Sequence, residues 1–118
     1  MILADTSIWI DHFRRGNPQL ATLLDAGQIL QHQLVLGELM CGNLRNRAEI
    51  LGLLFALPEA QKVTFDEIAR FVEARRLFGR GLGWTDVSLL ASAQLTGCKL
   101  WTLDKALLLA AAELGLQS

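Results

Sequence analysis

A short apolar run that ends in a carboxylate opens the chain and limits the folds it can adopt. Residues 2–4 (ILA) are apolar, Asp5 follows them, and the sequence is apolar again at residues 8–10. This pattern predicts a short buried strand over residues 2–4 and a helix over residues 7–14, which Gly16, Asn17 and Pro18 would end. The question that the pattern raises is why an acid stands at the edge of the predicted core.

Strand-like and helix-like segments alternate along the rest of the chain. Further strands are predicted over residues 29–31, 62–63 and 99–102, with 62–63 as a short edge strand. Helices are predicted over residues 20–26, 34–41, 47–57, 64–79, 85–97 and 104–115. Thr64 and Glu67 have the spacing of a capping box, which marks the start of one of these helices. The alternation predicts an α/β fold, a three-layer α/β/α sandwich with a mostly parallel sheet of four to five short strands.

Four acids stand out against this framework. Asp5 and Asp104 each follow a predicted strand, and the carboxyl ends of parallel strands meet at one edge of a sheet, where ligands bind. Glu38 lies in the apolar stretch LVLGELMCG, where a buried charge would need a cation or hydrogen-bond donors. Asp86 begins a helix after the glycine-rich stretch GRGLGW. Each acid alone is also explained as a helix cap or a solvated helix residue.

Together, the four acids favour a metal site. Clustered carboxylates repel one another, and oxygen ligands select Mg²⁺ or Mn²⁺ over zinc. The two histidines, His12 and His32, form no zinc-binding pattern with either cysteine. Because the amide would relieve part of the repulsion, Asp5→Asn is expected to melt at the same or a higher temperature than the metal-free wild type.

The amino-acid composition limits which partners the protein can have and in which cellular compartment it can work. Apolar residues make up 52% of the 118 residues, and no apolar run is long enough to cross a bilayer, so we expect no membrane role. The surplus apolar surface favours a partner interface, such as a homodimer. The helix at 47–57 is apolar on most of its surface and should be covered on more than one side. Cys41 and Cys98 are expected to be buried free thiols, which fits a cytoplasmic location.

Four short motifs, in order, resemble those of the PIN-domain ribonucleases, and in particular the VapC-type toxins of bacterial toxin–antitoxin pairs. They are ADTSIWID, GELMCG, TDVSLLASA and WTLDKAL, and the resemblance covers essentially all of residues 1–118 as one PIN-like nuclease domain. The residues that it implies as catalytic and as metal ligands are Asp5, Glu38, Asp86 and Asp104. It also implies a cognate antitoxin protein, an RNA substrate of the tRNA or rRNA class, and a strand after the last helix. Only residues 116–118 remain for that strand.

The implied activity is hydrolysis of RNA phosphodiesters by a water that Mg²⁺ makes acidic. Hydroxyl groups of Thr6, Ser7 and Thr102 are the candidates to orient that water or a carboxylate. The net charge of −1 does not exclude RNA, because without the four acids the other 8 acids and the 11 Lys and Arg residues leave +3. Arg80, in the glycine-rich stretch, is the candidate RNA contact, since arginine binds phosphate through a planar fork.

Three other interpretations remain open from the residues. A metal-dependent phosphatase would carry a second Asp two residues after Asp5, where this chain has Ser7. Metal-free RNA cleavage would need His12 and His32 to meet, and nothing in the sequence places them together. A non-catalytic RNA- or protein-binding module with the same fold would be favoured by loss of one of the acids, and all four are present. The apolar helix at 47–57 fits either an antitoxin groove or a dimer interface.

Overall fold

Three short parallel strands form the centre of the protein, which is described here from a computed structural model covering residues 1–118. They are β1 (Ile2–Ala4), β2 (Ile29–Leu30) and β3 (Lys99–Trp101), in the order β2-β1-β3. Leu3 pairs with Leu30 on one side and Leu100 on the other, and all three side chains are buried. Apart from Lys99 at the exposed start of β3, the strands are apolar, because both faces of the sheet are covered by helices, as is usual for parallel sheets.

The prediction of four to five strands is wrong, because the sheet has three strands and is extended at each edge by a single bridge. Beyond β2, Gln31 pairs with Glu59, three residues before the place where residues 62–63 were expected to form an edge strand. The chain then turns away, and the Gln61 N–H donates to Thr96. Beyond β3, Gln117 pairs with Leu100.

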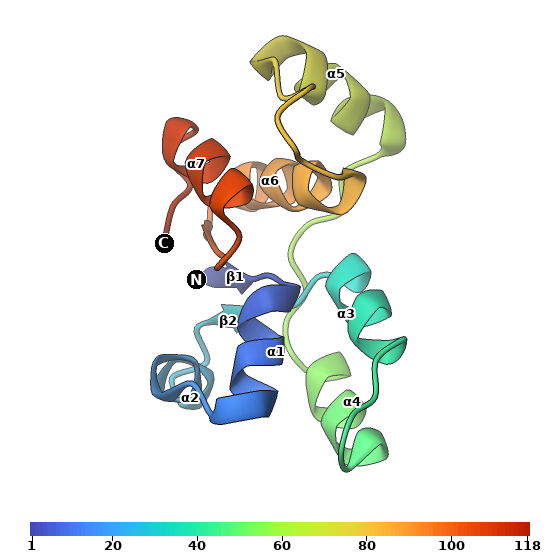
Figure 1. Cartoon of the computed structure of the whole chain (residues 1–118), viewed down its shortest axis with the longest axis vertical. Helices are drawn as coiled ribbons and strands as arrows, with labels where there is room; N and C mark the ends of the chain where they lie inside the picture. The colour runs from blue at the N-terminus through green and yellow to red at the C-terminus, as the bar shows by residue number, and fades with distance from the viewer.

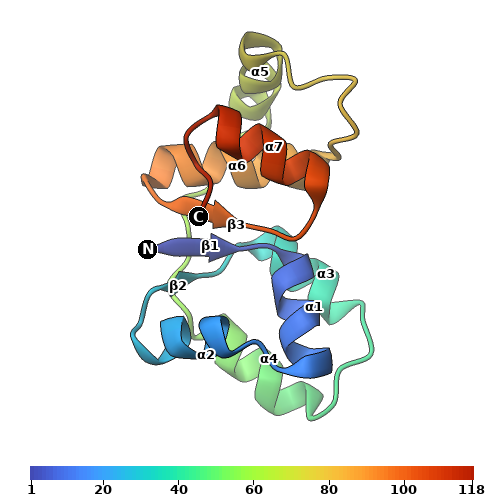
Figure 2. The ribbon, with the colours of Figure 1, turned by 60° about the vertical axis from the view of Figure 1, so that its left-hand side comes forward.

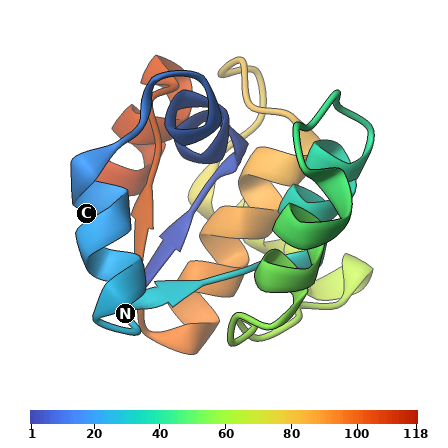
Figure 3. The same ribbon diagram turned by 90° about the horizontal axis from the view of Figure 1, so that it is seen from below.

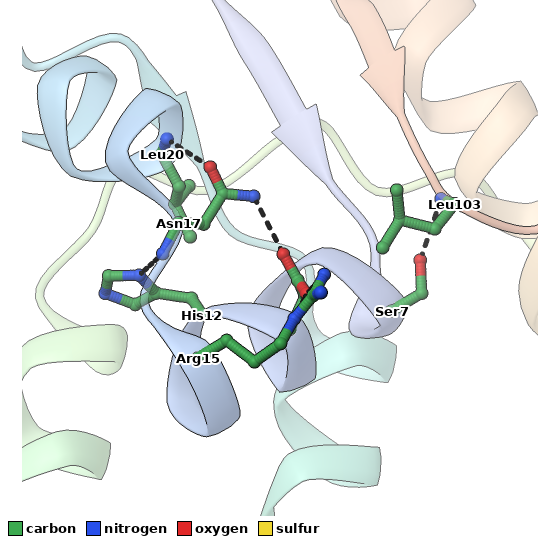
Figure 4. Close-up of polar contacts among 7 residues, drawn as sticks. Ser7, His12, Arg15, Asn17, Leu20 and Leu103 are labelled. Atoms are coloured by element: carbon green, nitrogen blue, oxygen red, sulfur yellow. Dashed lines mark hydrogen bonds and ion pairs between the residues drawn. The ribbon is translucent and has the colours of Figure 1, made fainter.

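Four helices cover one face of the sheet (Figures 1 and 2). They are α1 (Thr6–Arg15), α2 (Pro18–Asp25), α3 (Gln33–Met40) and α4 (Arg47–Phe55). The break between α1 and α2 is built from local hydrogen bonds (Figure 4): the Asn17 N–H donates to the His12 ring, and the Asn17 side chain accepts from the Leu20 N–H. Gly16 has φ +73°, a conformation that favours glycine.

The other face carries α5 (Phe65–Arg75), α6 (Trp84–Thr96) and α7 (Lys105–Glu113). The predicted capping box at Thr64 and Glu67 is confirmed, but α5 ends at Arg75, with Arg76 as its C-cap at φ +53°, and does not extend to Gly79. Residues 87–93 of α6 are all buried, because α6 lies between the sheet and other helices. None of the seven helices could span a lipid bilayer, because none combines the necessary length with an apolar composition.

The expectation about burial is wrong for one cysteine, and α4 keeps much of its apolar surface open in the single chain. Leu54 is the one buried residue of α4, and Leu53 and Phe55 are 62% and 55% exposed. The apolar surface of α4 is therefore open to a partner. Both cysteines are free, but Cys41 is exposed, because it lies where α3 ends and the chain leaves the core; only Cys98 is buried.

The topology gathers several helix starts at one edge of the sheet. The chain passes from β1 to β2 on one side and later to β3 on the other, so the carboxyl end of β1 is the switch point where ligands bind in such sheets. Figure 3 shows β1 leading into α1 and β2 leading toward α3. The helix α6 runs back to the start of β3, so its own start lies at the same edge as α1 and α7.

Candidate active site

Asp5 lies at the centre of this edge and is held by three hydrogen-bond donors. Its carboxylate, 6% exposed, accepts from the Ser7 hydroxyl at 2.5 Å, from the Ile8 N–H at 3.2 Å and from the Thr102 hydroxyl. The bond from Ile8 makes Asp5 the N-cap of α1. The remaining two bonds satisfy a buried carboxylate that would otherwise be costly to desolvate.

The hydroxyl groups of Ser7 and Thr102 also join the ends of β1 and β3. The Ser7 oxygen accepts from the Leu103 N–H at 3.0 Å, a contact between α1 and the segment after β3 (Figure 4). The Thr102 oxygen accepts from the Asp104 N–H at 3.0 Å. Each hydroxyl therefore donates to Asp5 and accepts from the backbone after β3. This arrangement fixes the orientation of Asp5 relative to Asp104.

Glu38 is exposed, so the structure favours the interpretation of this acid as a solvated helix residue over that of a charge buried in the apolar stretch. The apolar neighbours Leu36 and Leu39 point into the core, while Glu38 lies on the open side of α3. One carboxylate oxygen accepts from the Thr6 hydroxyl at 2.7 Å, which links α3 to the start of α1. Thr6, Ser7 and Thr102, the three hydroxyl residues singled out from the sequence, thus all donate to carboxylates of the acidic set.

Asp86 and Asp104 both lie at helix starts. Asp104 is the N-cap of α7 and accepts from the Leu107 N–H at 3.0 Å. Asp86 accepts from the Gly83 N–H at 2.9 Å, so α6 begins at Trp84, one residue earlier than predicted. Gly83 was not identified from the sequence as a residue of this site. The three-residue spacing between Gly83 and Asp86, which is that of a capping box, is the signal that could have found it.

The pKa of Asp86 is affected by the charges of the other three carboxylates. Its pKa is raised above the ordinary value of 3.8, mainly by burial, against the opposing effect of the Gly83 N–H. The negative charges of Asp104, Asp5 and Glu38 raise this pKa further. A group whose ionised form is disfavoured by three neighbouring carboxylates is typical of a functional site.

The carboxylates are neighbours without being a closed ligand cluster. No three His, Cys, Asp or Glu side chains come together tightly enough to form a preformed metal site. In Glu38, Asp86 and Asp104, one carboxylate oxygen accepts a hydrogen bond from the chain and the other oxygen has no such partner. The donor set, all carboxylate oxygens with uncompensated negative charge, fits a hard divalent cation such as Mg²⁺ or Mn²⁺.

Arg80 and the two histidines lie apart from these hydrogen bonds. Arg80 forms an ion pair with Glu113 of α7 at 2.8 Å and is 30% exposed. His12 accepts from the Asn17 N–H and His32 from the Leu34 N–H, so each ring caps a local turn. Burial is the main reason that the pKa of His32 is lowered.

Comparison with known families places this chain, with its α/β fold and its acidic edge, in a known class of protein, the PIN domain. The family model of the PIN domain matches residues 2–113, nearly the whole chain. The chain therefore belongs to the PIN domain family. The crystal structure of PAE2754 from Pyrobaculum aerophilum has a similar fold, with a TM-score of 0.64 over 92% of this chain and 78% of that one, at 19% identity.

Within the family, the sequence is similar to VapC-type proteins. Two curated relatives, both named Ribonuclease VapC32, come from Mycobacterium tuberculosis strains CDC 1551 / Oshkosh and ATCC 25618 / H37Rv. Each is 47% identical over 116 residues, which cover 98% of this chain and 94% of the relative. Identity of this extent over nearly the full length of both chains makes this protein a VapC-type member of the PIN domain family.

Proposed function

We propose that this protein is a divalent-metal-dependent endoribonuclease, the toxin of a toxin–antitoxin pair, which hydrolyses phosphodiester bonds of tRNA or rRNA. The observation that carries the proposal is the hydrogen-bonded acidic edge, where Thr102 donates to Asp5 and accepts from the Asp104 N–H. Burial, together with the charges of Asp104, Asp5 and Glu38, raises the pKa of Asp86 at this edge. Four carboxylates that repel one another at the carboxyl edge of the sheet are suited to hold a cation. The 47% identity to proteins named Ribonuclease VapC32 supports RNA as the substrate.

In this proposal Asp5, Glu38, Asp86 and Asp104 hold Mg²⁺ or Mn²⁺. A bound divalent cation would supply an acidified water and charge stabilisation for the phosphate undergoing in-line attack. The chain's own contribution is orientation. Ser7 donates to one oxygen of Asp5 and Thr102 donates to the other, so the two hydroxyl groups fix the orientation of this carboxylate.

Thr6 and Gly83 have a matching role for the other acids. Thr6 donates to one oxygen of Glu38, and the Gly83 N–H donates to one oxygen of Asp86. Each bond fixes the rotamer of a carboxylate while leaving its second oxygen available. Side chains that are fixed before the substrate arrives reduce the reorganisation needed in the transition state.

The partners follow from the same proposal. The exposed apolar residues of α4, such as Leu53 and Phe55, would contact either the cognate antitoxin or a second copy of the chain in a homodimer. Arg80 would contact RNA, in exchange for its ion pair with Glu113. A toxin acting on tRNA or rRNA would work in the cytoplasm.

The test is incubation of the purified protein with total RNA, with Mg²⁺ or with a chelator, followed by mapping of the product ends. We expect cleavage with Mg²⁺ alone, and 5′-phosphate and 3′-hydroxyl ends, because water rather than the 2′-hydroxyl attacks. Asp104→Asn, which retains an oxygen for the Leu107 N–H, should fold but not cut. Cyclic-phosphate ends produced in chelator would exclude this mechanism.

A further inference from the structure

A pocket of about 610 Å³ opens beside the acidic edge, between α1, α3 and the segment that leads into α4. Figures 1 and 2 show these three helices on the same face of the sheet. The residues that line the pocket include Ile10, Phe13, Arg14, Glu38, Arg45 and Ile50. Because Glu38 belongs both to the pocket and to the acidic set, the pocket is continuous with the candidate active site. The volume is in the range of small-molecule binding sites, about 300–1,000 Å³.

Two arginines of this pocket have no partner within the chain. Arg14 and Arg45 are exposed and take part in no ion pair or side-chain hydrogen bond. Other arginines are engaged: Arg15 binds Asp11, and Arg47 donates to backbone carbonyls. Among the lining residues, Glu38 is the one acid. The lining of the pocket therefore includes two guanidinium groups without a partner in the chain.

Contacts within the chain hold the walls of the pocket in place before any ligand binds. The side chain of Arg47 donates to the carbonyls of Met40 and Gly42, which holds the segment between α3 and α4 in place. The Phe13 ring packs against Trp9, with ring centroids 6.0 Å apart, and remains half-buried at the pocket wall. Proteins bind single-stranded nucleic acids with this combination of cations and an aromatic ring, because the cations contact phosphates and the bases stack on the ring.

We infer that this pocket binds the RNA strand directly next to the phosphate that is cut. Arg14 and Arg45 contact backbone phosphates, and a base packs against the wall formed by Phe13 and Ile10. The inference rests on the proposed function and adds to it a path for the substrate. An acidic protein segment could also reach the arginines. RNA is favoured because the pocket joins a phosphate-cutting edge through Glu38 and because Asn43 adds an amide suited to base edges.

The test measures binding of a labelled single-stranded RNA of about ten nucleotides, in chelator, as a function of salt. The variants are Arg14→Gln, Arg45→Gln and the pair, with Arg75→Gln as the matched control. Arg75 is an exposed, unpaired arginine of α5, at the opposite end of the molecule from α4 (Figure 1). For each lost phosphate contact, the slope of log affinity against log salt should fall by about 0.7, and by about 1.4 for the pair.

Two further variants separate charge and stacking from misfolding. Arg45→Lys should restore the wild-type slope, because it keeps the positive charge. Phe13→Leu should weaken binding at least about fivefold, the lower limit for loss of one base stack, with no change in slope. Unchanged slopes in Arg14→Gln and Arg45→Gln would overturn the inference.

A parallel cleavage assay distinguishes this inference from the proposed function. If the wild type cuts RNA with Mg²⁺ but the pocket variants bind RNA as the wild type does, the pocket inference fails and the nuclease proposal stands. If the slopes fall as expected but no divalent ion supports cutting, the pocket binds RNA and the nuclease proposal fails. A wild type that does not bind the strand overturns the inference.

Discussion

Asp86→Asn should stabilise the metal-free protein while abolishing cleavage. The raised pKa of Asp86 already includes the opposing Gly83 hydrogen bond, so the ionised carboxyl is on balance destabilising in the fold. Three like-charge pairs, screened because Asp86 is only half-buried, are worth about 0.3–0.5 kcal/mol each. Loss of the favourable helix-dipole interaction subtracts about 0.3–1 kcal/mol. The net gain is about 0.5 kcal/mol, or about 2 °C in Tm for a domain of this size.

The pH dependence of this gain has a definite sign. Because the pKa of Asp86 is raised above 3.8 in the fold, the folded state keeps the proton to higher pH than the unfolded chain. The wild type therefore loses stability as pH rises from about 4 through the raised pKa, and the Asn variant does not. We expect equal melting temperatures at the acid end and a difference that appears as pH approaches neutrality.

Thermal melts by circular dichroism, in chelator and in Mg²⁺, provide the measurement. At ten times its dissociation constant, Mg²⁺ should stabilise the wild type by about 1.4 kcal/mol and the variant by less. Asp66→Asn is the control, since Asp66 is an exposed acid in the first turn of α5, away from the four carboxylates. It should lower Tm slightly and respond to Mg²⁺ as the wild type does. A lower Tm for Asp86→Asn in chelator at neutral pH would refute the argument.

Three other substitutions test separate features. Asp5→Asn should destabilise the protein by about 1–3 kcal/mol in thermal melts, because its amide would face the donating hydroxyl of Thr102; this reverses the expectation from sequence. Glu113→Gln should strengthen RNA binding, measured by fluorescence anisotropy, if it releases Arg80 for RNA, and should change stability by less than about 1 kcal/mol. His32→Asn should remove the loss of stability expected as pH falls below 6.5, because the lowered pKa of His32 makes the unfolded chain the stronger proton acceptor.

Local patterns were sufficient to predict most of the fold. The alternation of short apolar runs with helical segments predicted a parallel α/β sheet, and the parallel pairing of β1 with β2 and β3 confirms it. Helix starts were also accessible, since the capping box at Thr64 depends on residues only three apart. Such signals are local, so they do not depend on how distant segments pack.

Features that depend on distant packing could not be predicted in the same way. The edge of the sheet depends on where the chain turns away from it. After Glu59 the Gln61 N–H donates to Thr96, and the segment does not form a strand. The exposure of α4 could not be decided from sequence, because an apolar helix surface does not reveal whether its cover comes from the same chain or from a partner. The placement of Glu38 stayed open for a related reason, because apolar neighbours in sequence need not be neighbours on the same helix face.

Helix capping and metal binding are not competing explanations for these acids. A carboxylate has two oxygens, and in Asp86 and Asp104 one oxygen accepts from a backbone N–H while the other is not hydrogen-bonded by the chain. The capping bond fixes the side chain at a helix start, and the topology brings the starts of α1, α6 and α7 to one edge of the sheet. Local capping thereby becomes the means of positioning. A chain that needs acids together at this edge can place them by ordinary cap rules, at the cost of repulsion that a cation would relieve.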